Sequence, residues 1–365
     1  MGEVVKDFES KFAHYIGSKF AVMVNSGSSA NLALTAAVRY LRKPIFTEGD
    51  EIIVPAVSWS TTYYPISQYG ATLCFVDIDL ETLNIDLDQL KKAINSRTKA
   101  IYVVNLLGNP AFLHEIVQLA EEHGLVVLED NCESLGASIS GKKAGTFGLA
   151  GTFSTFFSHH ISTMEGGLIA TDDEEIYQVL KSIRAHGWTR DLPDDNLVYR
   201  KTGAAWDDLF RFVLPGYNLR PLEIEAAIGR VQLAKLDNFV DVRRRNAQTF
   251  VNSMSELSGF LIQKEHGESS WFGFSLILQQ HLRGKRPQLI KTLEDNLIES
   301  RPIVAGNFTR NPVIKHLLHA PIPILPNADL VHDEGLFIGN HHYDLSEEIE
   351  LLVNVLKEFE RTHRT

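Results

Sequence analysis

A pair of adjacent histidines, His159 and His160, is the feature of this chain with the clearest chemical consequence. The pair follows two phenylalanines and a serine, and Glu165 and two glycines come shortly after it. An imidazole titrates near pH ~6.5 and so exchanges protons at neutral pH, but it has no primary amine for covalent catalysis. A bound metal ion is the alternative, yet neighbouring side chains converge poorly on one ion. We therefore predict a proton-transfer site at His159.

Acidic side chains follow the apolar run at residues 125–128, which predicts a buried strand. Asp130 and Glu133 come at the end of this strand, and Gly136 allows a turn soon afterwards. A carboxylate in this place can pair with a protonated ring nitrogen and keep the ring cationic. The alternative is that these acids cap the turn or are solvated. Together with the histidine segment, the pattern favours a binding site.

Two loops after predicted strands offer contacts for a phosphate and for a planar ring. Residues 25–31 follow the strand at residues 20–24 and open a helix, so Gly27 and Ser28 can meet a phosphate at the positive helix end. Trp59 follows the strand at residues 51–54 and can stack on a ring. Each pattern has a structural alternative, a helix cap for the first and a packed tryptophan for the second.

Alternating strands and helices must position these residues. Short apolar runs predict strands at residues 20–24, 51–54, 72–76, 100–104 and 125–128. Amphipathic segments that predict helices separate them at residues 29–41, 87–95 and 113–123. This alternation is typical of an α/β fold with a mostly parallel sheet covered on both faces. Ligands of such sheets bind at the carboxyl ends of the strands.

The second half of the chain predicts a smaller α/β domain. A helical pattern extends over residues 221–257 and would bridge two domains. Strands are expected at residues 260–263 and 273–278, and helices at residues 287–298 and 346–361. We therefore divide the chain into a large cofactor-binding domain, residues 1–235, and a small C-terminal domain, residues 236–365.

Composition excludes several classes of protein. The formal net charge of -11 over 365 residues argues against an extended nucleic-acid surface. Cys74 and Cys132 are too few for a disulfide framework, which favours a reducing cytoplasm. The beginning of the chain shows no signal peptide, and no apolar run approaches the ~20 residues of a membrane span.

The motifs occur in an order that resembles the sugar aminotransferases and dehydratases of the aspartate-aminotransferase fold, which use pyridoxal phosphate (PLP fold type I). The resemblance extends from Asn25 to His342, and His159 stands where most of these enzymes carry the cofactor-binding lysine. Positions that match the family's cofactor-binding residues are Gly27, Ser28, Trp59, Asp130, Glu133, Ser154 and Asn218. The resemblance implies that Asp130 pairs with the ring nitrogen, Glu133 faces the ring hydroxyl, and Asn218 reaches the phosphate in the partner subunit.

A histidine at the lysine position marks, within this family, the 3-dehydratases of nucleotide-linked 4-keto-6-deoxysugars. The resemblance therefore implies His159 as the catalytic base and a substrate such as GDP-4-keto-6-deoxy-D-mannose, on the route to colitose in lipopolysaccharide O-antigen. Glutamate would convert pyridoxal to pyridoxamine phosphate, and ammonia would be released. Candidate substrate contacts are His186, Arg190, Glu299 and Arg301. No metal ion is expected.

The resemblance leaves alternatives and one departure. A sugar aminotransferase lacks support because no lysine stands at residue 159, while a catalytically silent binder of cofactor or nucleotide sugar remains open. A relative that acts on a CDP-linked ketosugar needs a cysteine-ligated iron-sulfur cluster, for which two cysteines are too few. The family usually has a longer N-terminal arm, so a shortened start is expected. A homodimer with shared active sites is the expected assembly.

Overall fold

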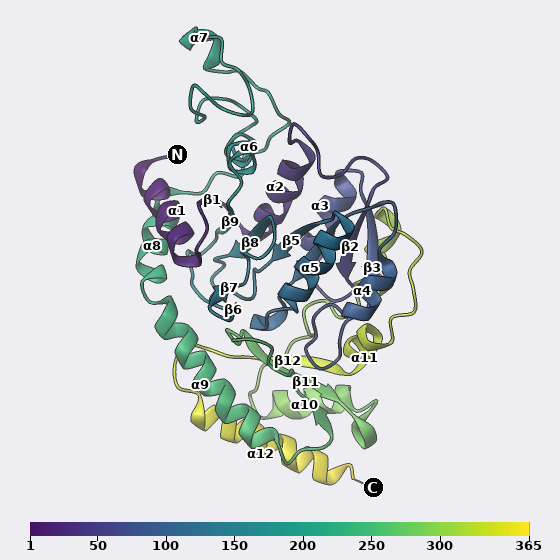
Figure 1. Ribbon diagram of the computed structural model, residues 1–365. Helices are drawn as coiled ribbons and strands as arrows, with labels where there is room; N and C mark the ends of the chain where they lie inside the picture. The colour runs from purple at the N-terminus through teal and green to yellow at the C-terminus, as the bar shows by residue number, and fades with distance from the viewer. Residues whose placement is uncertain (365) are drawn as a thin grey trace.

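A seven-stranded sheet forms the centre of the computed structural model, which describes residues 1–364 (Figure 1). Across the sheet, the strands are β1 (Phe20–Val24), β9 (Gly167–Thr171), β8 (Ala150–Ser154), β5 (Val126–Asp130), β4 (Thr98–Val104), β2 (Glu51–Pro55) and β3 (Thr72–Val76). Only β9 is antiparallel to its neighbours. All the other strands therefore end at one edge of the sheet. The predicted α/β architecture is confirmed.

Helices cover both faces of this sheet, because its strands are apolar on both sides. One core cluster joins the sheet to α2 (Gly27–Arg39), α3 (Ser60–Gln68) and α6 (Glu174–Arg184). On the other face lie α4 (Leu87–Ala93), α5 (Leu113–His123), α1 (Glu3–Ile16) and α8 (Glu223–Leu233). A two-stranded hairpin, β6 (Ser138–Ile139) and β7 (Lys142–Lys143), precedes β8.

A second, antiparallel sheet follows in the C-terminal part of the chain. Its strands are β10 (Phe260–Leu261), β11 (Gly273–Leu278) and β12 (Gly335–Gly339). The helices of this part are α9 (Leu236–Met254), α10 (Arg286–Asp295), α11 (Pro326–Glu334) and α12 (Ser346–Thr362), and α9 and α12 lie side by side (Figure 1). Within residues 1–364, no helix has the length and apolar character required to cross a membrane.

The prediction of one helix over residues 221–257 is wrong. The helix is interrupted between Leu233 and Leu236, so α8 and α9 are separate helices. The two helices have different partners: α8 packs on α1, where a Cβ on Gly229 would lie 2.6 Å from the Phe8 ring, whereas α9 packs on α12. One continuous straight helix could not pack against both α1 and α12. The domain division at residue 235 stays a prediction.

Residues 185–222 have little regular structure apart from α7 (Ala205–Asp208). This segment extends beyond the rest of the molecule, at the top of Figure 1. Three of its aromatic side chains are well exposed: Trp206 at 84%, Phe210 at 62% and Phe212 at 58%. Within one chain, the part around α7 therefore protrudes, whereas Leu219 of the same segment accepts a hydrogen bond from the Asn25 N–H at 3.0 Å, next to the carboxyl end of β1.

Candidate active site

A cavity of about 600 Å³ lies where the parallel strands end. Loops after β1, β2, β4, β5 and β8 line it, and residues from the C-terminal part, among them Phe272 and Phe337, close its other side. Eight of the twelve predicted site residues line this cavity: Gly27, Ser28, Trp59, Asp130, Glu133, Ser154, His159 and Arg301. These eight residues span positions 27 to 301 of the sequence. The fold brings them together at the carboxyl ends of the parallel strands.

The amino end of α2 and the end of β8 form a small polar cup in the cavity. Ser26 caps the helix by accepting a hydrogen bond from the Ser29 N–H, which leaves the N–H groups of Gly27 and Ser28 for a ligand. A Cβ on Gly27 would lie 2.7 Å from Ser154 Cβ, so only glycine keeps the cup open. Thr61 Oγ1 donates to Ser28 Oγ at 3.1 Å. The donors and the positive helix end suit a phosphate.

Asp130 is held on the cavity wall by three donors. Its Oδ2 accepts from Asn31 Nδ2 and from Thr62 Oγ1, each at 2.7 Å, and its Oδ1 accepts from the Cys132 N–H at 3.2 Å. The Asn31 amide is fixed in turn, because its Oδ1 accepts from Tyr102 and Thr152. Such a network stabilises an ionised carboxylate, which can hold a ring nitrogen protonated.

Glu133 has a different environment from Asp130. Its Oε2 accepts one backbone hydrogen bond, from the Leu107 N–H at 3.1 Å. Burial raises the pKa of Glu133 to about 7, with a further contribution from the nearby Asp130 charge. The carboxyl group is therefore largely protonated below neutral pH and can donate a hydrogen bond into the cavity.

His159 lies in the connection between β8 and β9, opposite the acids of β5. Burial and, to a smaller extent, the Arg243 guanidinium lower the pKa of His159 to about 4. Its Nδ1 is buried without a hydrogen-bond partner in the described structure, so Nε2 is the nitrogen left to exchange protons through the cavity. His160 is fully buried, and its Nε2 lies 3.1 Å from the Ser270 carbonyl oxygen. Only the first histidine of the pair thus faces a ligand.

An aromatic ring and a cation lie at the mouth of the cavity. Trp59 precedes α3 and is 56% exposed, which leaves one face of the indole free to stack. Arg301 pairs by backbone hydrogen bonds with Phe337 on β12 and therefore has a fixed position. Its guanidinium donates to Glu299 at 2.8 Å, and both side chains are exposed. Glu299 itself does not line the cavity.

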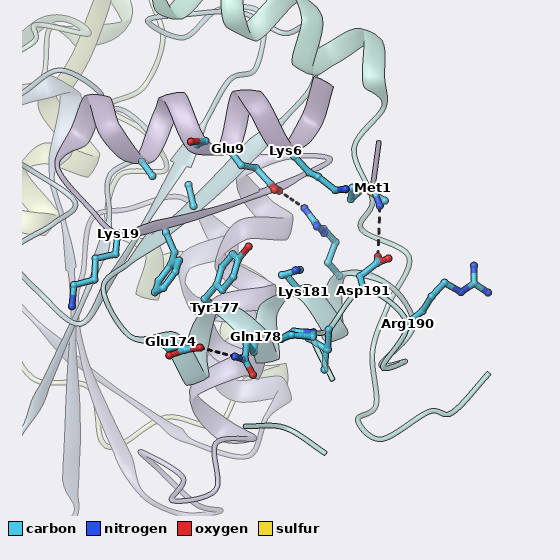
Figure 2. A pocket seen from close by; sticks show the side chains of 17 residues that line it. Met1, Lys6, Glu9, Lys19, Glu174, Tyr177, Gln178, Lys181, Arg190 and Asp191 are labelled. Carbon is cyan, nitrogen blue, oxygen red and sulfur yellow. Dashed lines mark hydrogen bonds and ion pairs between the residues drawn. The ribbon is translucent and has the colours of Figure 1, made fainter. Parts of the chain in front are cut away.

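The other predicted contacts lie on residues 185–222 and do not line this cavity. Asn218 is exposed and accepts a hydrogen bond from Arg220, and His186 stacks edge-on against Trp188. Arg190 borders a second cavity of about 770 Å³ between α1 and α6, but its side chain points outward (Figure 2). Its guanidinium lies 3.9 Å from the centre of the Trp188 ring. The roles of these residues stay predictions.

Several residues of the cavity were not singled out from the sequence. Asn31 lies one helical turn after Gly27, and this i, i+4 spacing could have indicated it. Glu165 is a second example: the sequence pattern predicts no role for it beyond its place after the histidine pair, yet it lines the cavity. Phe272 directly precedes β11 in the second sheet and lines the cavity. No local sequence pattern connects it to the other cavity residues, which are distant in sequence.

Known proteins resemble this chain over nearly its whole length. A family model described as the DegT/DnrJ/EryC1/StrS aminotransferase family matches residues 1–357. GDP-4-keto-6-deoxy-D-mannose 3-dehydratase of Yersinia pseudotuberculosis is 54% identical, over 98% of this chain and 91% of the relative.

Solved structures agree with this similarity. A GDP-4-keto-6-deoxymannose-3-dehydratase with a trapped adduct of PLP and glutamate superposes with a TM-score of 0.95, at 53% identity, over 98% of this chain and 93% of that one. A histidine-to-asparagine variant of that enzyme with bound GDP-perosamine has the same TM-score, identity and coverage. The aspartate-aminotransferase-like fold is confirmed, and the chain belongs to the DegT/DnrJ/EryC1/StrS aminotransferase family.

Proposed function

We propose that this protein is a pyridoxamine-phosphate-dependent 3-dehydratase of GDP-4-keto-6-deoxy-D-mannose. The observation that carries the proposal is that His159, and no lysine among the described residues, lines the cavity that holds Asp130 and the polar cup. Glutamate supplies the amino group, the substrate loses its C3 hydroxyl, and ammonia is released with a 3-deoxy-4-ketosugar. We place this reaction in the cytoplasm, in deoxysugar synthesis that leads to colitose in O-antigen.

The cavity residues fit the cofactor. Gly27, Ser28 and Ser154 would hold its phosphate, because the missing Cβ of Gly27 leaves a space lined with donors. Trp59 would cover one face of the ring, and Asp130 would hold the ring nitrogen protonated. Glu133 would donate to the ring hydroxyl. When bound, the cofactor supplies an electron-accepting ring that makes the proton on the amine-bearing carbon removable.

His159 moves the protons of the reaction in this proposal. Because its pKa is lowered to about 4, the imidazole is a free base at neutral pH, and Nε2 accepts a proton without first losing one. The resulting imidazolium donates that proton to the departing C3 hydroxyl, which leaves as water. An imidazole has no primary amine to form a Schiff base with the cofactor, so the cofactor would be retained by the polar cup, Asp130 and Trp59.

A second copy of the chain completes the site in this proposal. Asn218 is exposed and does not line the cavity of its own chain, and residues 205–212 of the same segment carry exposed apolar side chains. We propose a homodimer in which Asn218 of one subunit reaches the cofactor phosphate of the other. His186 and Arg190 would approach the substrate's diphosphate by the same route.

The test compares the wild type with His159→Asn. Asparagine cannot act as a base, so we expect cofactor binding within about threefold of wild type and a loss of dehydration of at least ~10³-fold. Incubation with cofactor, glutamate and GDP-4-keto-6-deoxy-D-mannose, followed by mass spectrometry, measures the loss of the C3 hydroxyl. Unchanged turnover would exclude His159 as the base.

The same assay separates the alternatives. An aminotransferase would yield an amino sugar and no free ammonia, while a silent binder would change neither substrate. A parallel incubation with CDP-4-keto-6-deoxyglucose tests the nucleotide and sugar. Ammonia that appears only when both glutamate and the GDP-linked ketosugar are present is the result that we expect.

A further inference from the structure

The imidazole of His159 contacts an aromatic ring from the second sheet. Phe272 immediately precedes β11, and its ring centre lies 5.1 Å from that of His159, with 60° between the planes. Phe156 meets the same imidazole edge-on at 5.9 Å. Two phenyl rings therefore pack against the imidazole of His159.

The backbone of Phe272 is anchored from both sides. Its N–H donates to the Leu107 carbonyl at 3.0 Å, and its carbonyl accepts from Arg243 Nη1 at 3.3 Å and from the Asn340 N–H at 3.4 Å. Leu107 and Trp271 both adopt left-handed backbone conformations, with φ of 54° and 46°. Strained non-glycine residues of this kind persist where the surrounding structure fixes them, often at functional sites.

The histidine loop is held against the same segment. His160 lies 3.1 Å from the Ser270 carbonyl oxygen, and the His160 ring is 5.7 Å from the Phe272 ring. Ser270 in turn donates its N–H to the Gly108 carbonyl at 2.8 Å. His159 and Phe272 therefore cannot separate without breaking contacts between the two sheets.

We propose that Phe272 is a positioning residue for His159: its ring fixes the imidazole plane and excludes water from one side, so that the imidazole stays uncharged. A phenyl ring cannot replace the hydrogen bonds that water gives to an imidazolium, and burial is the largest cause of the lowered pKa of His159. This inference rests on the proposed function in one respect: the uncharged imidazole acts there as the base. The ionisable groups around this site are Asp130, Cys132, Glu133, His160, Glu165, Arg243 and Arg301.

The test follows the protonation of His159 directly. In full-length protein with ¹³C-labelled histidine, the resonance missing from His159→Asn identifies His159, and its chemical shift is recorded against pH. We expect Phe272→Ala to raise the titration midpoint by about one pH unit, and Phe272→Leu to raise it by less, because leucine still excludes some water. Phe274→Leu is the matched control, since Phe274 lies on β11 but stacks on Phe250 in the core.

Each outcome decides the proposal. A folded Phe272→Ala protein whose His159 titrates as in wild type would overturn it, and so would an equal shift in Phe274→Leu. The pH dependence of dehydration is measured separately on the same variants. A shifted resonance without a shifted acidic limb of the rate would support the positioning role and contradict His159 as the base, so the two failures are distinguishable.

Discussion

Asp130 and Glu133 lie three residues apart, yet the protein gives them opposite surroundings. Asp130 accepts from Asn31, Thr62 and the Cys132 N–H, whereas Glu133 accepts only from the Leu107 N–H. Several donors favour a carboxylate, and burial with one donor favours a carboxylic acid. The loop after β5 thus offers an anion and a proton donor to one ligand.

The stability of the protein should reveal the proton on Glu133. In the folded protein Glu133 keeps its proton up to about pH 7, whereas an ordinary glutamate releases it near 4.5. Between these values the folded state binds more protons than the unfolded state, so this group's contribution to stability falls as pH rises. Glu133→Gln removes that loss. We expect it to be more stable than wild type at about pH 8 by on the order of 2 kcal/mol, with no such gain at about pH 4.5.

Urea unfolding of both proteins without cofactor, at the two pH values, measures this difference. The gain must depend on pH, because glutamine is neutral throughout. An equal difference between the variant and the wild type at both values would mean that folding does not raise the pKa of Glu133.

At the scale of elements, the amino end of α2 depends on one missing side chain. A Cβ on Gly27 would lie 2.7 Å from Ser154 Cβ and 3.0 Å from its Oγ. Gly27→Ala should therefore push α2 and β8 apart and weaken cofactor binding by at least ~10-fold, which is about 1.4 kcal/mol, without unfolding the protein.

Titration with pyridoxal phosphate, followed by absorbance, measures this effect. Gly339→Ala is the matched control, because a Cβ there meets no atom within 4 Å. Wild-type affinity in Gly27→Ala would mean that the phosphate binds elsewhere.

The sequence predicts the elements better than the contacts between them. The five strands up to residue 130 and the helices α2, α4 and α5 follow from apolar periodicity, and the carboxyl ends of the strands locate Gly27, Trp59 and Asp130, whereas α1 and α3 are not predicted. The break between α8 and α9 depends on two different packing partners, which one continuous periodicity does not reveal. Phe272 reaches His159 only through the packing of two sheets, so no spacing in the sequence indicates it.

At the scale of the molecule, the exposed aromatic residues and Asn218 share one segment. Side chains such as Trp206 and Phe210 bury their apolar surface only if another surface covers them. A two-fold dimer would place equal segments over both active sites, which makes each site depend on both chains.

Mixed dimers test this dependence. His159→Asn lacks the base, and Asn218→Asp places a negative charge against the phosphate of the partner subunit, so each variant alone should have little activity. Equal co-expression should give half mixed dimers, each with one intact site, and hence about one quarter of wild-type activity. Purification with two different tags isolates the mixed dimer. Activity no greater than that of the two parents would mean that Asn218 acts within its own subunit or not at all.

The reversed direction of β9 has a consequence for how this enzyme's chemistry changes during evolution. Because β9 pairs antiparallel with β8, residues 155–166 leave and re-enter the sheet at the same edge, and Thr155 and Thr163 join through their hydroxyls at 2.6 Å. Neither end of the loop requires a particular side chain at residue 159. If His159 is the base, as proposed, exchange of an amine for an imidazole there would alter the reaction while the sheet keeps its pairing. A substitution at this one position could therefore change the reaction in a descendant protein that keeps the same fold.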